Sequence, residues 1–258
     1  MRIAALQMKA AAGDVTANLA RIDAAAQEAA AGGARLLVAP ELATTGYGAG
    51  DVIRDLAEPL DGPQVNQLAA ISQAHGLAVV AGFAERDGSQ VFNSLVLVDG
   101  TETPLAYRKM QLYADYERAL FSPGPLQTTL CRLDNLTFGF LICYDVEFPE
   151  AVRALARAGA DAVLVPTALP RGPFADFIAT SVVPVRAFEN QLFVAYANHA
   201  GQDDAFTYAG LSRIVGPDGT ALAAAGPEED SVIFADIDPA AFAESRTANT
   251  YLTDLRKH

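Results

Sequence analysis

The segment from Leu136 to Gly159 constrains this chain most, because it places a cysteine between a buried strand and a helix. The apolar residues 136–142 include β-branched and aromatic side chains, which predicts a buried strand. Pro149 suits the first turn of a helix, and the helix-forming residues 150–158 end at a glycine. The chain is therefore expected to turn sharply at Cys143.

A turn of this kind resembles the nucleophile elbow of serine hydrolases, which lifts one side chain above the sheet and directs backbone N–H groups at the same space. It suits a nucleophilic thiol at Cys143, with the N–H of Tyr144 helping to bind an oxyanion. The alternative is that Cys143 is a small buried hydrophobic residue, as most single cysteines in a core are. The turn alone leaves both interpretations open.

Strands alternate with helices in both halves of the chain and are interrupted by hairpins, which predicts an α/β protein with two sheets and outer helices. Glu41 and Lys109 each follow a strand-like run, as Cys143 does. Open α/β folds build their sites where strands end. These three residues are therefore expected to form one cluster.

The remaining elements are predicted from periodicity, turn residues and helix-capping signals. A helix should begin at Asp14 or Thr16 and end at residues 32–33, and a second helix is expected at 174–190, where Pro184 should start or kink part of it. Residues 110–125 are expected to form a polar and aromatic loop, and the tail from Arg246 to be exposed. Further helices are expected at 51–57, 63–75 and 150–158, and strands at 3–8, 36–39, 77–83, 91–98, 105–107, 128–133, 136–142, 161–166, 191–198, 211–215, 221–225 and 232–237.

Length and composition predict a compact chain with one domain over residues 1–258, because 51% of the residues are hydrophobic and 19% are charged. Lys and Arg number 18 against 31 acidic residues, and the net charge of −13 argues against a nucleic-acid partner. No export signal or membrane-spanning run is visible, so a cytoplasmic location without a membrane partner is expected. The two cysteines, Cys131 and Cys143, should be free thiols, and Cys131 should be an inert packing residue.

The sequence gives little support for metal-dependent or phosphate chemistry. The three histidines, His75, His199 and His258, have no zinc-ligand spacing, and there is no glycine-rich phosphate loop. A metal-dependent phosphoesterase would need histidines and several aspartates at strand ends. His75 and His199 are instead expected to be surface polar residues or hydrogen-bonding residues at the edge of the core.

The chemistry of the cluster can be stated from its residue types. A thiol is mostly protonated at neutral pH, since its ordinary pKa is about 8.5, so an attacking cysteine needs a base such as Glu41. Attack on an amide or nitrile carbon creates a negative charge that an ammonium such as Lys109 can stabilise. Read singly, Glu41 and Lys109 are each better explained as a solvated charge at a strand end.

In its motifs the chain resembles the nitrilase, or carbon-nitrogen hydrolase, superfamily. The resemblance runs in order along nearly the whole chain, and the joint order of the motifs makes it specific. The motifs are 4–7 (AALQ), 37–41 (LVAPE), 92–94 (FNS), 107–109 (YRK), Glu117, 121–124 (FSPG), 142–145 (ICYD), 148–150 (FPE), 186–190 (RAFEN), 197–198 (AN), 210–212 (GLS) and 217–219 (PDG).

The resemblance implies a four-layer α-β-β-α sandwich, paired into a homodimer or larger homo-oligomer, and a Glu-Lys-Cys triad without cofactor or metal. By position, Glu41 is the general base, Lys109 the oxyanion stabiliser and Cys143 the nucleophile. Glu117 matches a second glutamate that orients the lysine and takes part in proton handling. The segment 186–190, with its Arg, Glu and Asn, is interpreted as structural.

The form of the cysteine motif is similar to that of bacterial amidases, so hydrolysis of a small-molecule amide ranks first. N-carbamoyl amide hydrolysis ranks second and nitrile hydrolysis third. The chain departs from the family pattern at Gln111, where many relatives have histidine, and it has no tryptophan. A non-enzymatic alternative is a small-molecule-binding or assembly domain of the same fold.

Overall fold

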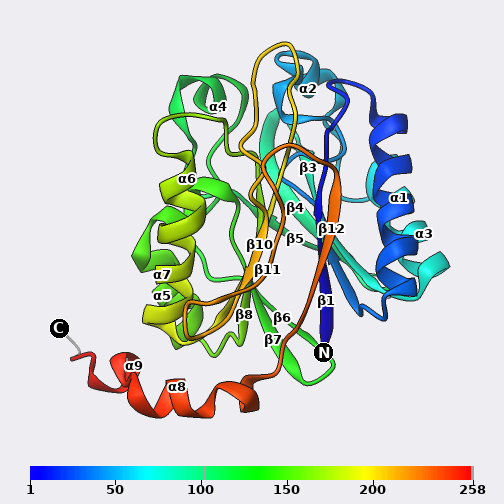
Figure 1. The fold of residues 1–258 in the computed structure, drawn as a ribbon. Coiled ribbons are helices and arrows are strands. Elements are labelled where there is room, and N and C mark those ends of the chain that lie inside the picture. Colours follow the sequence, from blue (N-terminus) through cyan, green and yellow to red (C-terminus); the bar gives the residue numbers. More distant parts are fainter. Residues whose placement is uncertain (101–102, 257–258) are drawn as a thin grey trace.

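The computed structural model describes residues 1–100 and 103–256 and contains two six-stranded sheets packed face to face (Figure 1). The first sheet has the order β12-β1-β2-β3-β4-β5 and the second the order β11-β10-β9-β8-β7-β6. Both sheets are mixed, because parallel strand pairs at their centres are flanked by antiparallel pairs. The strands are β1 (Arg2–Gln7), β2 (Leu36–Val38), β3 (Ala78–Asp87), β4 (Gln90–Val98), β5 (Leu105–Arg108), β6 (Leu130–Leu133), β7 (Leu136–Phe140), β8 (Ala162–Thr167), β9 (Phe193–Asn198), β10 (Arg213–Val215), β11 (Ala221–Ala224) and β12 (Ser231–Asp236).

Helices cover the outer face of each sheet and complete four layers (Figure 1). The first sheet is covered by α1 (Val15–Ala31) and α3 (Pro63–His75), and the second by α5 (Pro149–Arg157), α6 (Ala175–Phe177) and α7 (Val183–Asn190). The short helices α2 (Val52–Leu56), α4 (Ala114–Leu120), α8 (Ala243–Ala248) and α9 (Tyr251–Asp254) lie at the ends of the sandwich. None of the helices in the described ranges combines the length and the apolar character needed to cross a bilayer.

The apolar strands are explained by burial on both faces. In β1, Ile3 and Ala5 pack in the core between the two sheets, whereas Ala4 and Leu6 pack against the outer helices. A strand buried on both faces reads as a continuous apolar run, because neither side needs polar residues. The predicted pair of sheets with outer helices is therefore confirmed.

Two predicted segments differ in detail from the structure. Residues 110–125, expected to be a loop, contain the helix α4, in which the buried Glu117 side chain accepts the backbone N–H of Tyr113 at 2.8 Å. The helix expected at 174–190 contains a wider π-type turn at Ile178–Val182, just before Pro184. A proline ring crowds the carbonyl four residues earlier, and such a turn is one way to accommodate it.

Residues 246–256 are largely exposed as predicted, although they form the end of α8 and all of α9. Tyr251 nevertheless packs against Phe188 of α7, with 5.7 Å between ring centroids. His75 Nε2 donates a hydrogen bond of 2.7 Å to the Asp23 carboxylate near the surface, which agrees with its expected polar role.

Candidate active site

The turn after β7 has the expected sharp geometry. Ile142 is extended, with φ of −122°, and Cys143 then adopts a φ of +46°, a left-handed conformation that is uncommon for a residue with a side chain. A short 3-10 turn over Cys143–Glu147 follows before α5 begins at Pro149. Strained backbone of this kind persists only where its surroundings hold it in place.

Asp145 holds the turn from inside. Its buried carboxylate accepts the Ile142 N–H at 3.1 Å, the Gln111 N–H at 2.8 Å and the Tyr107 hydroxyl at 2.8 Å. These bonds join the cysteine turn to the segment that carries Lys109. Burial raises the pKa of Asp145 to about 6, although Lys109 and the three donors oppose the shift.

Three strand ends from the two sheets meet above this turn. Glu41 follows β2 and Lys109 follows β5, both in the first sheet, whereas Cys143 follows β7 in the second. The Lys109 ammonium donates to Glu41 Oε1 at 2.6 Å and to Glu117 Oε1 at 2.5 Å. All four side chains are buried, so the structure brings together every catalytic residue predicted from the sequence.

Glu41 is fixed by partners that the sequence did not indicate. Its Oε1 also accepts the Asn93 amide at 2.7 Å, and its backbone carbonyl accepts His199 Nε2 at 2.7 Å. His199 is thus the buried hydrogen-bonding residue that one of the two predictions for it described. Within the described residues, the second carboxylate oxygen of Glu41, Oε2, is buried and accepts no hydrogen bond.

Glu117 is held as firmly as Glu41. Besides Lys109, it accepts the Tyr47 hydroxyl at 2.9 Å and the Tyr113 N–H at 2.8 Å. Burial raises the pKa of the Glu117 carboxyl, Lys109 lowers it, and the second carboxylate, Glu41, raises it again. Of the side chains that hold the two glutamates, Asn93 lies in the motif at 92–94, whereas Tyr47 lies in no motif found in the sequence.

Charges and burial determine the resting state of the nucleophile. Burial raises the pKa of the Cys143 thiol well above its usual value, Glu41 adds to the shift, and Lys109 opposes it. Burial also disfavours the charged form of Lys109, but Glu117 and Glu41 outweigh this and raise the pKa of the ammonium. Burial thus favours the neutral form of the Cys143 thiol and the two carboxylates favour the charged form of Lys109, so attack requires a base.

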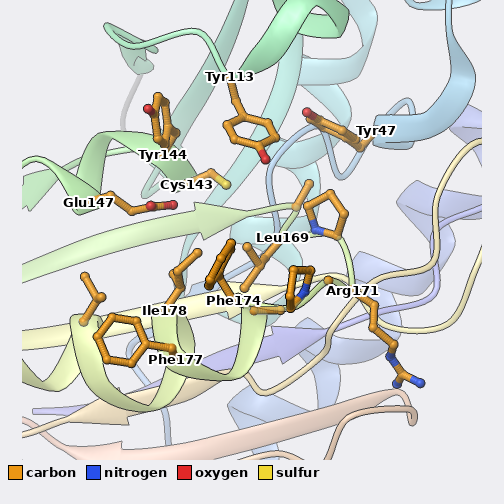
Figure 2. A pocket seen from close by; sticks show the side chains of 16 residues that line it. Tyr47, Tyr113, Cys143, Tyr144, Glu147, Leu169, Arg171, Phe174, Phe177 and Ile178 are labelled. Atoms are coloured by element: carbon orange, nitrogen blue, oxygen red, sulfur yellow. The ribbon is translucent and has the colours of Figure 1, made fainter.

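Cys143 opens into a cavity of about 470 Å³ (Figure 2). Its lining is mostly apolar and aromatic, as is typical of small-molecule sites. The side chains labelled in Figure 2 include Tyr47, Tyr113, Tyr144, Glu147, Leu169, Arg171, Phe174, Phe177 and Ile178. Among the cavity residues, only Cys143 and Tyr144 were predicted from the sequence, because the others lie in loops and helices without a motif of known meaning.

Tyr144 has two relations to the site. Its backbone N–H follows Cys143 directly, and its ring lines the cavity between Tyr113, at 5.2 Å between centroids, and Phe148, at 4.9 Å. The oxyanion role of the N–H stays a prediction, whereas the ring position was not foreseen.

Arg186 supports the cysteine turn, as a structural residue does. Its Nε donates to the Val146 carbonyl at 3.0 Å, and its Nη2 donates to the Glu147 carbonyl at 2.7 Å.

The arrangement offers a nucleophile, a base and a cation, and no ligand set for a metal. Among residues 1–100 and 103–256, no group of three or more histidine, cysteine or acidic side chains is placed to hold a metal ion. Cys131 is a free, half-buried thiol in β6 and does not line the cavity.

Comparisons with known proteins agree with this site. The sequence profile of the family described as carbon-nitrogen hydrolase matches residues 2–247. An "(R)-stereoselective amidase" from Pseudomonas is 38% identical over 99% of this chain and 92% of its own length. A "nitrilase" from Pyrococcus abyssi is 32% identical over 92% of this chain and 90% of its own length.

Solved structures show the same fold. The amidase of Nesterenkonia sp. AN1, of the nitrilase superfamily, is 35% identical in one structure that covers 99% of this chain and 95% of that one, with a TM-score of 0.89. Other structures of that amidase include a complex with butyramide and a product of Michael addition of acrylamide at the active-site cysteine. The predicted superfamily, sandwich fold and enzyme class are confirmed, and the chain belongs to the carbon-nitrogen hydrolase family.

Proposed function

We propose that this protein is an amidase that converts a small carboxamide to a carboxylic acid and ammonia through a thioester at Cys143. The observation that carries the proposal is the carboxylate oxygen Oε2 of Glu41, which is buried and accepts no hydrogen bond from the described residues, at a site where the Cys143 thiol opens into the cavity. A carboxylate without a competing donor is available to accept the thiol proton. The amidase activities of the Pseudomonas and Nesterenkonia relatives support the same reaction.

In the first half of the reaction, Glu41 takes the thiol proton while Cys143 Sγ forms a bond to the amide carbon. The carbonyl oxygen becomes negative and is stabilised by the Lys109 ammonium and the Tyr144 N–H, which are fixed before the charge appears. The C–N bond then breaks, and the proton held by Glu41 goes to the leaving nitrogen. Ammonia leaves, and the acyl group stays on Cys143 as a thioester.

In the second half, water attacks the thioester carbon and a carboxylate accepts its proton. The thiolate leaves and is protonated again, which releases the acid and restores the enzyme. Glu117 contacts the same ammonium as Glu41, so we assign it the positioning of Lys109 and a share in this proton transfer. No step needs a cofactor or a metal.

The test is ammonia release from a panel of small amides, N-carbamoyl compounds and nitriles, with and without a chelator. We expect release from amides, unaffected by the chelator, and acyl mass on the peptide that contains Cys143 after brief mixing with butyramide. Turnover retained in Cys143→Ala, or acyl mass on Cys131, would overturn the proposal. Cys131→Ala is the matched control and should keep its activity.

Each alternative function predicts a different result with this panel of compounds. Preferred release from N-carbamoyl compounds or from nitriles would replace the amide by the second or third substrate class. Absence of turnover with all three would favour a binding or assembly domain. The single domain, the cytoplasmic location and the homo-oligomer stay predictions beside this proposal.

A further inference from the structure

The cavity contains a carboxylate that the proposed reaction does not use. Glu147 ends the 3-10 turn that begins at Cys143, and Figure 2 shows both side chains entering the cavity from that turn. The Glu147 side chain is half-buried, and within the described residues its carboxylate takes part in no hydrogen bond or ion pair. A charge in a mostly apolar pocket without a partner is costly, so it needs an explanation.

The two nearby arginines do not supply that partner. The Arg186 guanidinium donates hydrogen bonds to the main-chain carbonyls of Val146 and Glu147, and it also donates to the Glu189 carboxylate at 3.0 Å. Arg171 lines the cavity, but its guanidinium points away from Cys143 (Figure 2) and lies 3.5 Å from Glu228. The cavity therefore carries the negative charge of Glu147 near Cys143, whereas the positive charge of Arg171 points away from Cys143.

The surroundings of Glu147 favour an incoming cation. Burial raises the pKa of the Glu147 carboxyl, and the charges of Lys109 and Arg186 oppose the shift only in part. A ligand cation in contact with the carboxylate would offset this cost of burial. The rings of Tyr113 and Tyr144 line the same cavity, and aromatic faces also attract ammonium groups.

We propose that Glu147 selects carboxamides that carry a protonated amine, with the ammonium against Glu147 while the amide carbon lies at Cys143 Sγ. The inference rests on the proposed amidase function and names its substrate class. In a 3-10 turn the chain rises about 2 Å per residue, so these two residues are separated by roughly 8 Å of backbone. An ω-amine on a chain of a few methylenes fits this span better than an α-amine. Substrates with a carboxylate at that end would be repelled.

The experiment compares 4-aminobutanamide with pentanamide, which has the same length and no charge. In the wild-type enzyme we expect kcat/KM to favour the amino amide. In Glu147→Gln the ratio of the two kcat/KM values should fall on the order of 10-fold, as expected for loss of one charge-assisted hydrogen bond. Succinamate, with a carboxylate in place of the amine, should be a poor substrate that improves in the variant.

Glu150→Gln is the matched control, because it removes the same charge from an exposed residue three positions further along the chain. It should leave the ratio as in the wild type. Glu147→Asp keeps the charge but withdraws it by one methylene, so its preference should move toward 5-aminopentanamide. This second variant keeps the test valid if Glu147→Gln folds poorly.

Two results would overturn the inference. One is an equal loss for the charged and the neutral amide in Glu147→Gln, which would make Glu147 a structural residue. The other is a wild-type enzyme that shows no preference for the amine. Failure of the amidase proposal is a separate result, namely no ammonia from either amide. Calorimetric binding of the same two amides to Cys143→Ala, with and without Glu147→Gln, then decides the role of Glu147 without turnover.

Discussion

Lys109 is the residue on which the other charges depend, because its buried ammonium lies between two buried carboxylates. We predict that Lys109→Ala lowers turnover on the order of 10²-fold or more, as loss of an oxyanion partner does. It should also lower the free energy of unfolding by roughly 3–5 kcal/mol, since Glu41 and Glu117 would lose their common cation. Steady-state kinetics and urea denaturation measure the two effects.

The control for this prediction is Lys109→Arg, which keeps the charge. A planar guanidinium is larger than an ammonium and cannot place a point charge at the same position, so rescue should be poor. Wild-type rates in Lys109→Arg would show that the site needs only a positive charge nearby.

The two glutamates should differ in the step that they limit. Glu41→Gln removes the carboxylate whose buried Oε2 accepts no hydrogen bond from the described residues, so we expect no acyl-enzyme. Glu117→Gln keeps that base and should acylate slowly but deacylate more slowly still, leaving acyl mass on Cys143. Rapid-quench mass spectrometry distinguishes the variants. Equal acyl occupancy in both, or full activity of Glu117→Gln, would contradict this division of work.

At the scale of elements, the turn after β7 depends on Asp145, which accepts one hydrogen bond from the turn, at Ile142, and two from the segment around Lys109, at Tyr107 and Gln111. Asp145→Asn replaces one acceptor by an NH₂ donor, which must then face a backbone N–H or the Tyr107 hydroxyl. We predict a loss of activity on the order of 10-fold, together with lower stability, because the Cys143 conformation loses support. Activity and thermal unfolding measured on one preparation check both.

The pH dependence of this variant follows from the raised pKa. Asp145 has a pKa of about 6 in the folded chain against 3.8 ordinarily, so between these values the folded state binds more protons than the unfolded state. Its contribution to stability is complete below about pH 3.8 and is lost as the pH rises through 6, by roughly 3 kcal/mol. The stability deficit of Asp145→Asn should therefore be larger at pH 4 than at pH 7. A constant deficit would contradict the assignment.

Elements that are stabilised by a local apolar pattern could be predicted from the sequence, whereas elements that depend on contacts with distant residues could not. The central strands were found because their apolar runs are buried on both faces, which is a local signal. The helix α4 was missed because its polar Glu117 is stabilised by Lys109 and Tyr47, which no pattern within residues 110–125 reveals. Glu41, Lys109 and Cys143 could be predicted from strand ends and motifs, whereas the support from Asn93 and His199 joins residues far apart in the sequence.

At the scale of the whole molecule, the predicted self-association has a candidate surface. Phe174, Phe177 and Val185 lie along the α6–α7 segment with exposed fractions of 69%, 62% and 48%. Burying such side chains against a second copy is favourable by about 25 cal/mol per Å². Physiological salt screens the net charge of −13 beyond about 8 Å, so repulsion should not prevent contact.

We therefore predict at least a dimer by sedimentation at micromolar concentration, and a shift toward monomer in Phe177→Glu. Leu126→Glu is the matched control, because Leu126 is 82% exposed outside this segment. A monomer in the wild type, or an equal shift in both variants, would refute the surface.

The pairing of β12 with β1 has a consequence for the order of synthesis. When residue 150 has left the ribosome, Glu41, Lys109 and Cys143 are all present, but β1 still lacks its antiparallel neighbour at residues 231–236. The imidazole that bonds the Glu41 carbonyl is also missing until residue 199 is made, and the Met1 ammonium donates to Ile237 at 3.0 Å. The reactive thiol is thus translated long before the framework that positions its base. A nascent chain of this protein should gain the ability to turn over substrate only after residues 231–236 have been translated.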